Sequence, residues 1–227
     1  MRVEIEVRAR FANPFNVGSG AEAGSFAERP TLRDKDGWPF IPASSLKGRL
    51  RHECERLAKH LLGEKWKEYN CHPPRAESMC QGEDKLCPAC RIFGSPWRRG
   101  LLHFSDLSLA ETEKEKIGGK APSPTIRYGV SLSRHRRVAE EDLLFTTEVF
   151  LPGWELELVG RIEGDLEEKE LALVLAGLRA IAGLGGGKTG GLGWCRLSAT
   201  PYRILADGSR QKISDETFKE GLRGWGR

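Results

Sequence analysis

The feature that most constrains this chain is the segment Gly183–Gly193, in which seven of eleven residues are glycine. Glycine weakens helices and strands alike, so no packed element explains this density. The segment therefore needs either backbone freedom or the close approach of a partner. The segment before it, Glu167–Ala182, is rich in Leu and Ala and predicts a helix. The segment after it, Gly193–Arg203, predicts a strand.

The residues from Ala182 to Thr189 resemble a phosphate-binding P-loop in which Ala182 replaces the first glycine. In that motif backbone N–H groups cradle the phosphates and the lysine, here Lys188, reaches the terminal ones. A P-loop follows a strand and opens a helix, and here the order is reversed, which disfavours nucleotide hydrolysis. Two interpretations stay open. The segment is a flexible connection, or its amides approach a sugar–phosphate chain such as RNA bound along a sheet face.

The rest of the chain alternates strands, helices and long polar segments. Val3–Phe11 alternates apolar and charged residues and predicts a half-buried strand. Leu46–Leu62 has apolar residues at helical spacing, with Ser44 or Ser45 as a candidate N-cap. Further strand candidates are Leu101–Leu109, Leu143–Val149 and Trp154–Ile162, the last two joined by a turn at Pro152-Gly153.

We take the overall order as β, α, β, β, α, β with long insertions. This is an α+β, ferredoxin-like order, which the RNA-recognition motif also uses. We expect one domain over residues 1–227, with insertions at 64–91 and 110–150. The sequence of Ala110–Tyr128, within the second insertion, predicts a loop. The tail from residue 204 to 227 is polar and weakly helical at best.

Charge and hydropathy exclude a membrane protein. The net charge is +4, and basic residues cluster at Arg134–Arg137 and at Trp97–Arg99. The longest apolar run, Leu171–Leu184, is interrupted by Arg179 and is too short to span a bilayer. The N-terminus lacks the apolar core of a signal peptide, so we expect a cytoplasmic protein.

Four of the six cysteines lie within twenty residues, inside the polar insertion at 64–91. Cys71, Cys80, Cys87 and Cys90 are separated by eight, six and two residues, and the last pair has the short spacing of a zinc knuckle. In a cytoplasmic chain, clustered cysteines favour a metal over disulfides. We expect a structural zinc ion, with His72 as an alternative to Cys71, and we expect Cys54 and Cys195 to lie in the core.

Five stretches together resemble the RAMP superfamily of CRISPR-associated proteins. Residues 33–49, RDKDGWPFIPASSLKGR, resemble the family signature D-G-x-P-x-I-P-G-S-S-L-K-G, except that Ala43 stands where glycine is usual. The other four stretches are Pro14–Gly20, Arg91–Ser95, Gly100–Asp106 and the glycine segment itself. The resemblance runs from about Arg2 to Ser198 and is strongest to the repeated backbone subunit of type III CRISPR effectors.

The resemblance implies a protein that binds guide (CRISPR) RNA and complementary target RNA, together with other effector subunits and copies of itself. It implies a β-hairpin thumb over Val130–Glu148 and a catalytic acid in the loop after the first strand, where this chain has Glu28 instead of aspartate. Target cleavage would use Mg²⁺. The residues expected to contact RNA are Asn16, Gly18, Ser44, Ser45, Lys47, Arg49, Arg134, His135, Arg136, Arg137, Gly185, Gly186, Gly187 and Lys188.

Two alternatives stay open beside this hypothesis. The chain is a structural RAMP subunit that binds RNA and cuts nothing, or it is a metal-independent endonuclease that processes precursor guide RNA. The second would use His135, Tyr128 or Lys188 for acid–base chemistry. The cysteine insertion and the loop around Glu28 favour a backbone subunit over a processing enzyme.

Overall fold

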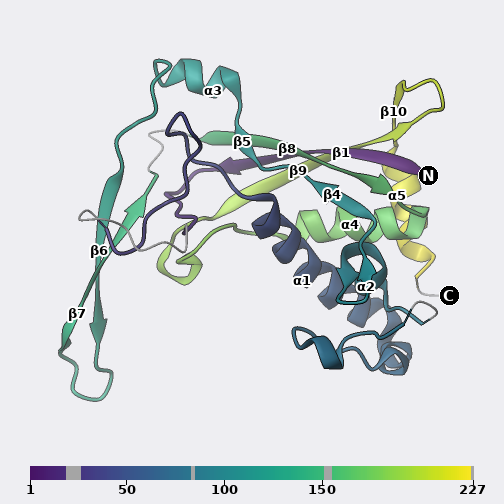
Figure 1. Cartoon of the computed structure of the whole chain (residues 1–227), viewed down its shortest axis with the longest axis horizontal. Helices are drawn as coiled ribbons and strands as arrows, with labels where there is room; N and C mark the ends of the chain where they lie inside the picture. The colour runs from purple at the N-terminus through teal and green to yellow at the C-terminus, as the bar shows by residue number, and fades with distance from the viewer. Residues whose placement is uncertain (19–26, 83–84, 151–154, 226–227) are drawn as a thin grey trace.

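The fold is mixed α+β, and its largest element is an antiparallel sheet. The computed structural model describes residues 1–18, 27–82, 85–150 and 155–225 (Figure 1). In the sheet, β1 (Arg2–Phe11) lies between β8 (Leu156–Asp165) and β9 (Cys195–Ile204). Two short strands, β4 (Leu102–Phe104) and β5 (Ser108–Leu109), pair with β8, and β10 (Arg210–Lys212) pairs with β9. The strand order is β10-β9-β1-β8-β4.

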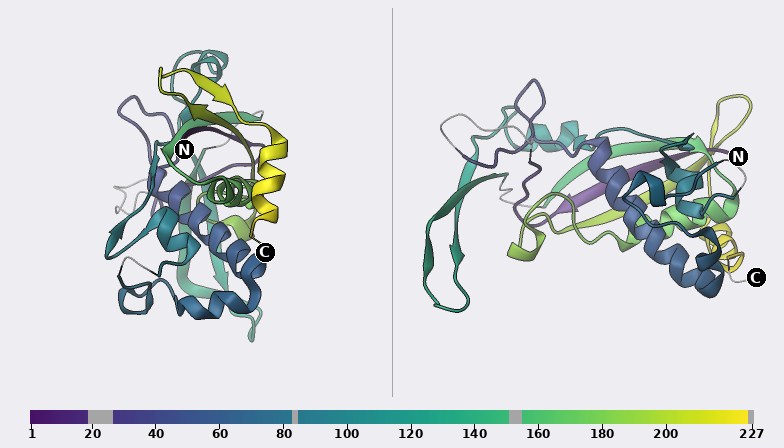
Figure 2. Two further views of the ribbon diagram at one scale, coloured as in Figure 1. Left: turned by 90° about the vertical axis from the view of Figure 1, so that its right-hand side faces the viewer. Right: turned by 60° about the horizontal axis from the view of Figure 1, so that its bottom comes forward.

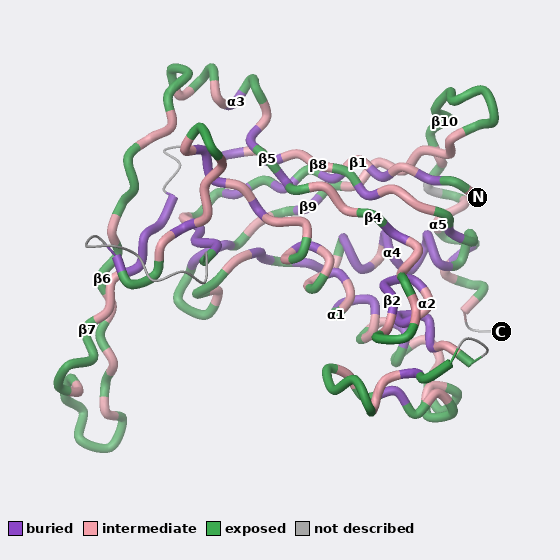
Figure 3. The backbone as a smooth tube through the Cα atoms, in the orientation of Figure 1, coloured by how far each residue is buried: buried purple, intermediate pink, exposed green. Residues whose placement is uncertain are grey.

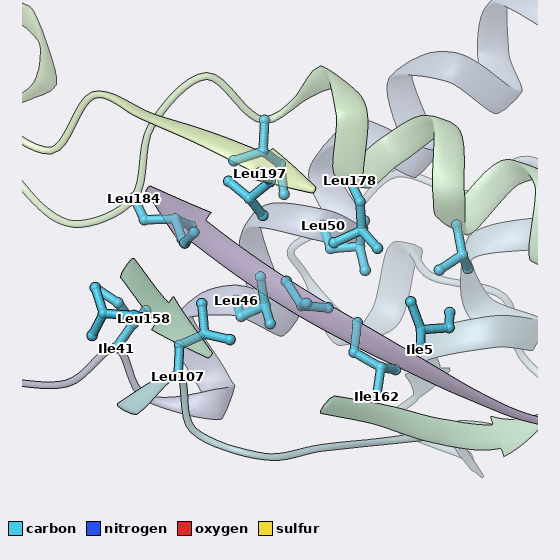
Figure 4. Packing of buried hydrophobic residues seen from close by; sticks show 14 of the residues in the cluster. Ile5, Ile41, Leu46, Leu50, Leu107, Leu158, Ile162, Leu178, Leu184 and Leu197 are labelled. Carbon is cyan, nitrogen blue, oxygen red and sulfur yellow. The ribbon is translucent and has the colours of Figure 1, made fainter. Parts of the chain in front are cut away.

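Two helices, α1 (Ala43–Leu62) and α4 (Glu168–Ala180), cover one face of this sheet (Figure 2). The alternation of β1 explains why, since Val3, Ile5 and Val7 all point to the helical side and are at most 1% exposed. Leu46 and Leu50 of α1 reach the same core, as Figure 4 shows. The helix α5 (Asp215–Arg223) packs against α4.

The opposite face of the sheet is charged. Arg8 and Arg10 of β1 both pair with Glu157 of β8, at 3.1 and 2.9 Å. Arg210 of β10 pairs with Glu4. This face therefore neutralises its own charges.

Two further parts of the chain lie outside the main sheet. After α1 come the 3₁₀ turns η1 (Gly63–Tyr69) and η2 (Ala76–Ser78), the short helix α2 (Pro88–Phe93), and a small hairpin of β2 (Gly94–Ser95) and β3 (Arg98–Arg99). The helix α3 (Glu111–Lys116) precedes a long hairpin of β6 (Thr125–Leu132) and β7 (Ala139–Val149). This hairpin is a separate two-stranded sheet that projects from the body (Figure 1).

Most expected elements are present, with shifted ends. The predicted helix at Leu46–Leu62 begins at Ala43, and Pro42 occupies its N-cap position without a side-chain cap. The prediction that Ser44 or Ser45 caps this helix is therefore wrong, because both residues lie in its first turn. The predicted strand Leu101–Leu109 is divided into β4 and β5, since the chain leaves the sheet between Phe104 and Ser108.

Three other expectations need correction. Leu143–Val149 is a strand, but it pairs with β6 instead of joining the main sheet; the predicted turn at Pro152-Gly153 lies outside the described residues. Ala110–Tyr128 contains α3 and the start of β6 and is not simply a loop. The polar tail forms β10 and α5, whose half-buried residues include Phe218. None of the helices in the described ranges is long and apolar enough to cross a membrane.

Candidate nucleic-acid interface and metal centre

The glycine segment forms a loop that is closed on itself and anchored to the segment after β1. Leu184 N donates to Gly193 O at 2.9 Å, which closes the base of the loop. Gly186 N donates to Asn16 O at 2.9 Å and Gly193 N donates to Pro14 O at 2.8 Å. These bonds fix the loop, here called the glycine loop, relative to residues 14–18.

The glycines of this loop serve two different purposes. Gly185 has φ +89°, and a Cβ on it would lie 2.3 Å from Asn16 O; Gly193 has φ +68°, and its Cβ would lie 2.1 Å from Leu184 O. The fold itself requires glycine at these two positions. By contrast, a Cβ on Gly186 would find its nearest neighbour at 3.6 Å, and one on Gly190 would meet nothing within 4 Å. No packing in the described structure requires glycine at Gly186 and Gly190, which leave bare backbone at the surface.

A cleft of about 280 Å³ lies between the glycine loop, the start of α1 and the loop after β1. Ser45 and Arg49, one turn apart on α1, form one wall, and Lys188 lies on the glycine-loop side. Lys188 Nζ donates to Gly185 O at 2.7 Å, and Arg49 Nη2 lies 2.9 Å from Glu53 Oε1. Six of the predicted contact residues therefore line this glycine-loop cleft: Gly18, Ser45, Arg49, Gly185, Gly186 and Lys188.

Other predicted residues lie nearby without lining the cleft. Ser44 is exposed and Lys47 is half-buried on α1, on a different side of the helix from Ser45. Asn16 is 5% exposed, and its amide donates to Arg29 O, Thr31 Oγ1 and Glu148 O. The Asn16 side chain thus holds two loops and the base of the long hairpin together. Gly187 lines the neighbouring pocket, which Asn16 also borders.

The remaining predicted basic residues are at the tip of the β6–β7 hairpin, away from the cleft (Figure 1). Arg134–Arg137 are all exposed, and Arg136 Nη2 pairs with Glu140 Oε2 at 2.5 Å. The hairpin also exposes Leu144 at 62%, although its sequence is apolar there. Figure 3 shows the exposed and half-buried character of this whole projection, apart from its base.

Glu28, the expected catalytic acid, is exposed beside the base of this hairpin. Its backbone N–H donates to Thr146 Oγ1 at 3.0 Å, and Arg29 N donates to Thr146 O at 3.1 Å. In the described ranges no ion pair of Glu28 is found. Asp34 accepts from the backbone N–H groups of Asp36 and Trp38, so it stabilises a local turn.

The four clustered cysteines meet in one buried group. The sulfurs of Cys71, Cys80, Cys87 and Cys90 all lie within 4.8 Å of one another, and none of the four residues is more than 4% exposed. A tetrahedral zinc site with Zn–S bonds of about 2.3 Å requires sulfurs about 3.8 Å apart. This cysteine group fits such an ion. It is also the only group of potential metal ligands of its kind found among the described residues.

The surroundings of this group favour a thiolate at Cys90, whereas they raise the pKa of the Cys71 and Cys87 thiols. Backbone N–H groups of Cys87 and Cys90 donate to sulfurs at 3.3 and 3.4 Å. A hydrogen bond from the Cys87 thiol, together with the Arg51 guanidinium, lowers the pKa of the Cys90 thiol to about 5. Burial raises the pKa of the Cys71 thiol to about 12, so ordering four thiolates here needs a cation. His72 is exposed and its ring bonds to Asn70, which leaves Cys71 as the fourth member.

Two features of these sites were not predicted. Arg51 of α1 donates to Cys90 Sγ at 3.4 Å and to Gly94 O at 2.8 Å, linking the helix to the cysteine group. A second pocket lies between the glycine loop and the base of the β6–β7 hairpin, with Arg29 and Phe145 on its wall. Residues so far apart in sequence carry no shared local signal, and the exposed Tyr128 also lies on this wall.

Comparison with known proteins identifies the family. The model of the RAMP superfamily matches residues 8–196, which include the end of β1, α1, the cysteine group, the hairpin and the glycine loop. A separate comparison with curated proteins finds no match. Because the family model covers most of the sequence, the chain belongs to the RAMP superfamily of CRISPR-associated, RNA-binding proteins.

Proposed function

We propose that this chain is a guide-RNA-binding backbone subunit of a type III CRISPR effector, and that the RNA backbone lies in the glycine-loop cleft. The observation that carries the proposal is the convergence of Ser45, Arg49 and Lys188 with the bare backbone of Gly186 around one cleft. Hydroxyl, guanidinium and ammonium groups bind phosphates. The Gly186 N–H already donates to Asn16 O, so Gly186 contributes by lacking a side chain, which lets the RNA backbone approach closely.

The location of the cleft supports contact with the RNA backbone over contact with bases. It lies at the end of the sheet beside the first turn of α1, where the helix dipole places partial positive charge. The amides of Ala43 and Ser45 in this turn already donate to Asp106 Oδ1 and Pro42 O, so the side chains of Ser45 and Arg49 are the groups that face the RNA. The open face of the sheet, where we expected RNA, is occupied by ion pairs such as Arg10 with Glu157. Backbone contacts of this kind carry no sequence code, which suits a protein that must accept many guides.

The architecture supports a ferredoxin-like core for this single domain. In chain order β1, the β4/β5 segment, β8 and β9 are its four strands, and α1 and α4 are its two helices. Their spatial order places β1 and β8 in the centre, with antiparallel neighbours throughout. The cysteine group and the β6–β7 hairpin are then insertions into this core.

In this proposal the β6–β7 hairpin is the thumb. Its exposed tip carries Arg134, His135 and Arg137 for phosphates of the guide–target duplex, and the projecting shape suits contact beyond the chain's own body. Further copies of the chain and other effector subunits would bind along the same guide.

Cleavage of target RNA is a further part of the proposal. Glu28 offers an exposed carboxylate beside the base of the hairpin. Mg²⁺ is commonly held by one or two carboxylates with water and phosphate oxygens, and when bound it stabilises the charge of the reacting phosphate. Glu28 belongs to no group of three or more potential metal ligands within the described ranges, so the RNA itself would supply ligands.

The alternative of a precursor-processing endonuclease has weaker support. His135 lies at the tip of the hairpin, and Tyr128 pairs with Thr146 towards its base. Lys188 Nζ already donates to Gly185 O. These three groups do not form one acid–base site. A purely structural subunit differs from our proposal only in Glu28.

The proposed RNA path is tested by affinity for single-stranded RNA as a function of salt. Lys188→Ala is compared with Lys212→Ala, which removes an exposed lysine from β10 at the other end of the sheet. We expect Lys188→Ala to weaken binding and to reduce the slope of log K against log salt by about 0.7, the value for one phosphate contact on a single strand. Equal effects of the two variants would contradict the proposed path, and thermal unfolding of both checks that the loop still folds.

A further inference from the structure

A second pocket of about 330 Å³ adjoins the glycine-loop cleft, between the glycine loop and the base of the β6–β7 hairpin. Its wall includes Arg29, Tyr128, Phe145, Gly186 and Leu192. We propose that this pocket receives one unstacked nucleobase of the bound RNA, which stacks on the guanidinium of Arg29. The inference rests on the proposed function, because it requires the RNA backbone to pass Gly186.

The floor of the pocket is a stacked pair. The Arg29 guanidinium lies 4.5 Å from the centroid of the Phe145 ring. Phe145 stands directly opposite Gly129 in the hairpin, and a Cβ on Gly129 would come within 2.4 Å of the ring. The ring therefore lies over the glycine, and Arg29 covers it. Guanidinium planes and aromatic rings are the surfaces on which proteins stack unpaired bases.

Arg29 is held in place by its backbone while its charge stays available. Its N–H donates to Thr146 O at 3.1 Å and its carbonyl accepts from Glu148 N at 2.9 Å. The side chain is exposed and has no carboxylate partner in the described part of the chain. A guanidinium held over an aromatic ring, with its outer face open to solvent and its charge unpaired, suits a ligand that is both planar and negatively charged.

Size and continuity favour a single base. The volume is at the low end of the range for small-molecule sites, about 300–1,000 Å³, and is too small for a base pair with its backbone. Gly186 lines both this pocket and the glycine-loop cleft. A phosphate held in the cleft therefore places the adjoining base at the mouth of the pocket, where Tyr128, 70% exposed, forms a second aromatic surface.

The test compares two RNA oligonucleotides of equal length, one oligo(U) and one with the same backbone but no bases. The variants are Arg29→Lys, which keeps the charge and removes the plane, and Lys188→Ala, which removes a proposed phosphate contact. We expect Arg29→Lys to weaken oligo(U) binding by roughly 5- to 150-fold, the range for one stacked base, and to leave abasic binding nearly unchanged. Lys188→Ala should weaken both equally. Tyr128→Phe should behave as wild type, since it keeps the ring.

Each contrary result has its own meaning. If Arg29→Lys weakens both oligonucleotides equally or neither, the base pocket is wrong while RNA binding stands. If Arg29→Lys leaves RNA binding intact but prevents self-association measured by sedimentation, the pocket holds a protein segment and the inference is overturned. If wild type binds neither oligonucleotide, the proposed function fails and the base pocket fails with it.

Discussion

Substituting Gly185 by alanine should destabilise the protein, because the new side chain has no room. At φ +89° an alanine pays about 1–2 kcal/mol for the left-handed conformation. Its Cβ would also lie 2.3 Å from Asn16 O, a backbone atom that cannot rotate away. Relief requires the loops to separate, which breaks the bond from Gly186 N to Asn16 O and removes about 0.5–1.5 kcal/mol. We expect Gly185→Ala to lower the free energy of unfolding by about 1.5–3.5 kcal/mol.

The measurement is urea unfolding followed by fluorescence, with Gly186→Ala as the matched control. Gly186 is outside the left-handed region, and its Cβ would have its nearest neighbour at 3.6 Å. Its alanine variant should be within about 0.5 kcal/mol of wild type in stability, yet bind RNA more weakly because a methyl group covers the backbone. If the two variants were equally stable, the distinction between glycines that the loop needs to fold and glycines that only leave its backbone exposed would be wrong.

Three further predictions concern other parts of the chain. Purified protein should contain one zinc ion per chain; Cys87→Ser with Cys90→Ser should lose it, whereas Cys195→Ser should retain it, as measured by metal analysis. Within an assembled effector, Glu28→Ala should abolish regularly spaced, Mg²⁺-dependent cuts in complementary RNA without preventing its binding; unchanged cleavage would remove Glu28 from the reaction. Gly48 lies on the exposed side of the first half of α1, where a Cβ would meet nothing within 4 Å. Gly48→Ala should therefore raise the free energy of unfolding by about 0.5–1 kcal/mol. A lower melting temperature than wild type would contradict the open surface at this position.

Some features were predictable because local patterns determine them. β1 is half-buried along its whole length, so its sequence alternates, and its bounds differ from the prediction by one residue. Four cysteines at these spacings in a polar insertion need a common partner, and the structure brings all four together. Both are cases where one short stretch of sequence contains the whole signal.

Other features depend on contacts between distant segments. The apolar and β-branched residues of Leu143–Val149 indicate a strand but not its partner, which is β6 and not the main sheet. The tail forms α5 because α4 covers it; Gly221 lies against Ala172 and the Glu168 carbonyl, and no local pattern reveals that neighbour. The number of glycines in the segment likewise could not show that Gly185 is required for folding and Gly186 is not, because the contact with Asn16 O that separates them comes from a distant segment.

The most direct test of the account is to map where RNA contacts the chain. Ultraviolet crosslinking of the bound complex, followed by mass spectrometry of the peptides, gives the contact residues without mutation. We expect crosslinks within Gly183–Gly193, at the first turns of α1 and at the base of the β6–β7 hairpin. Crosslinks confined to the open face of the sheet, around Arg8, Glu157 and Arg210, with none in the glycine loop, would contradict the proposed RNA path.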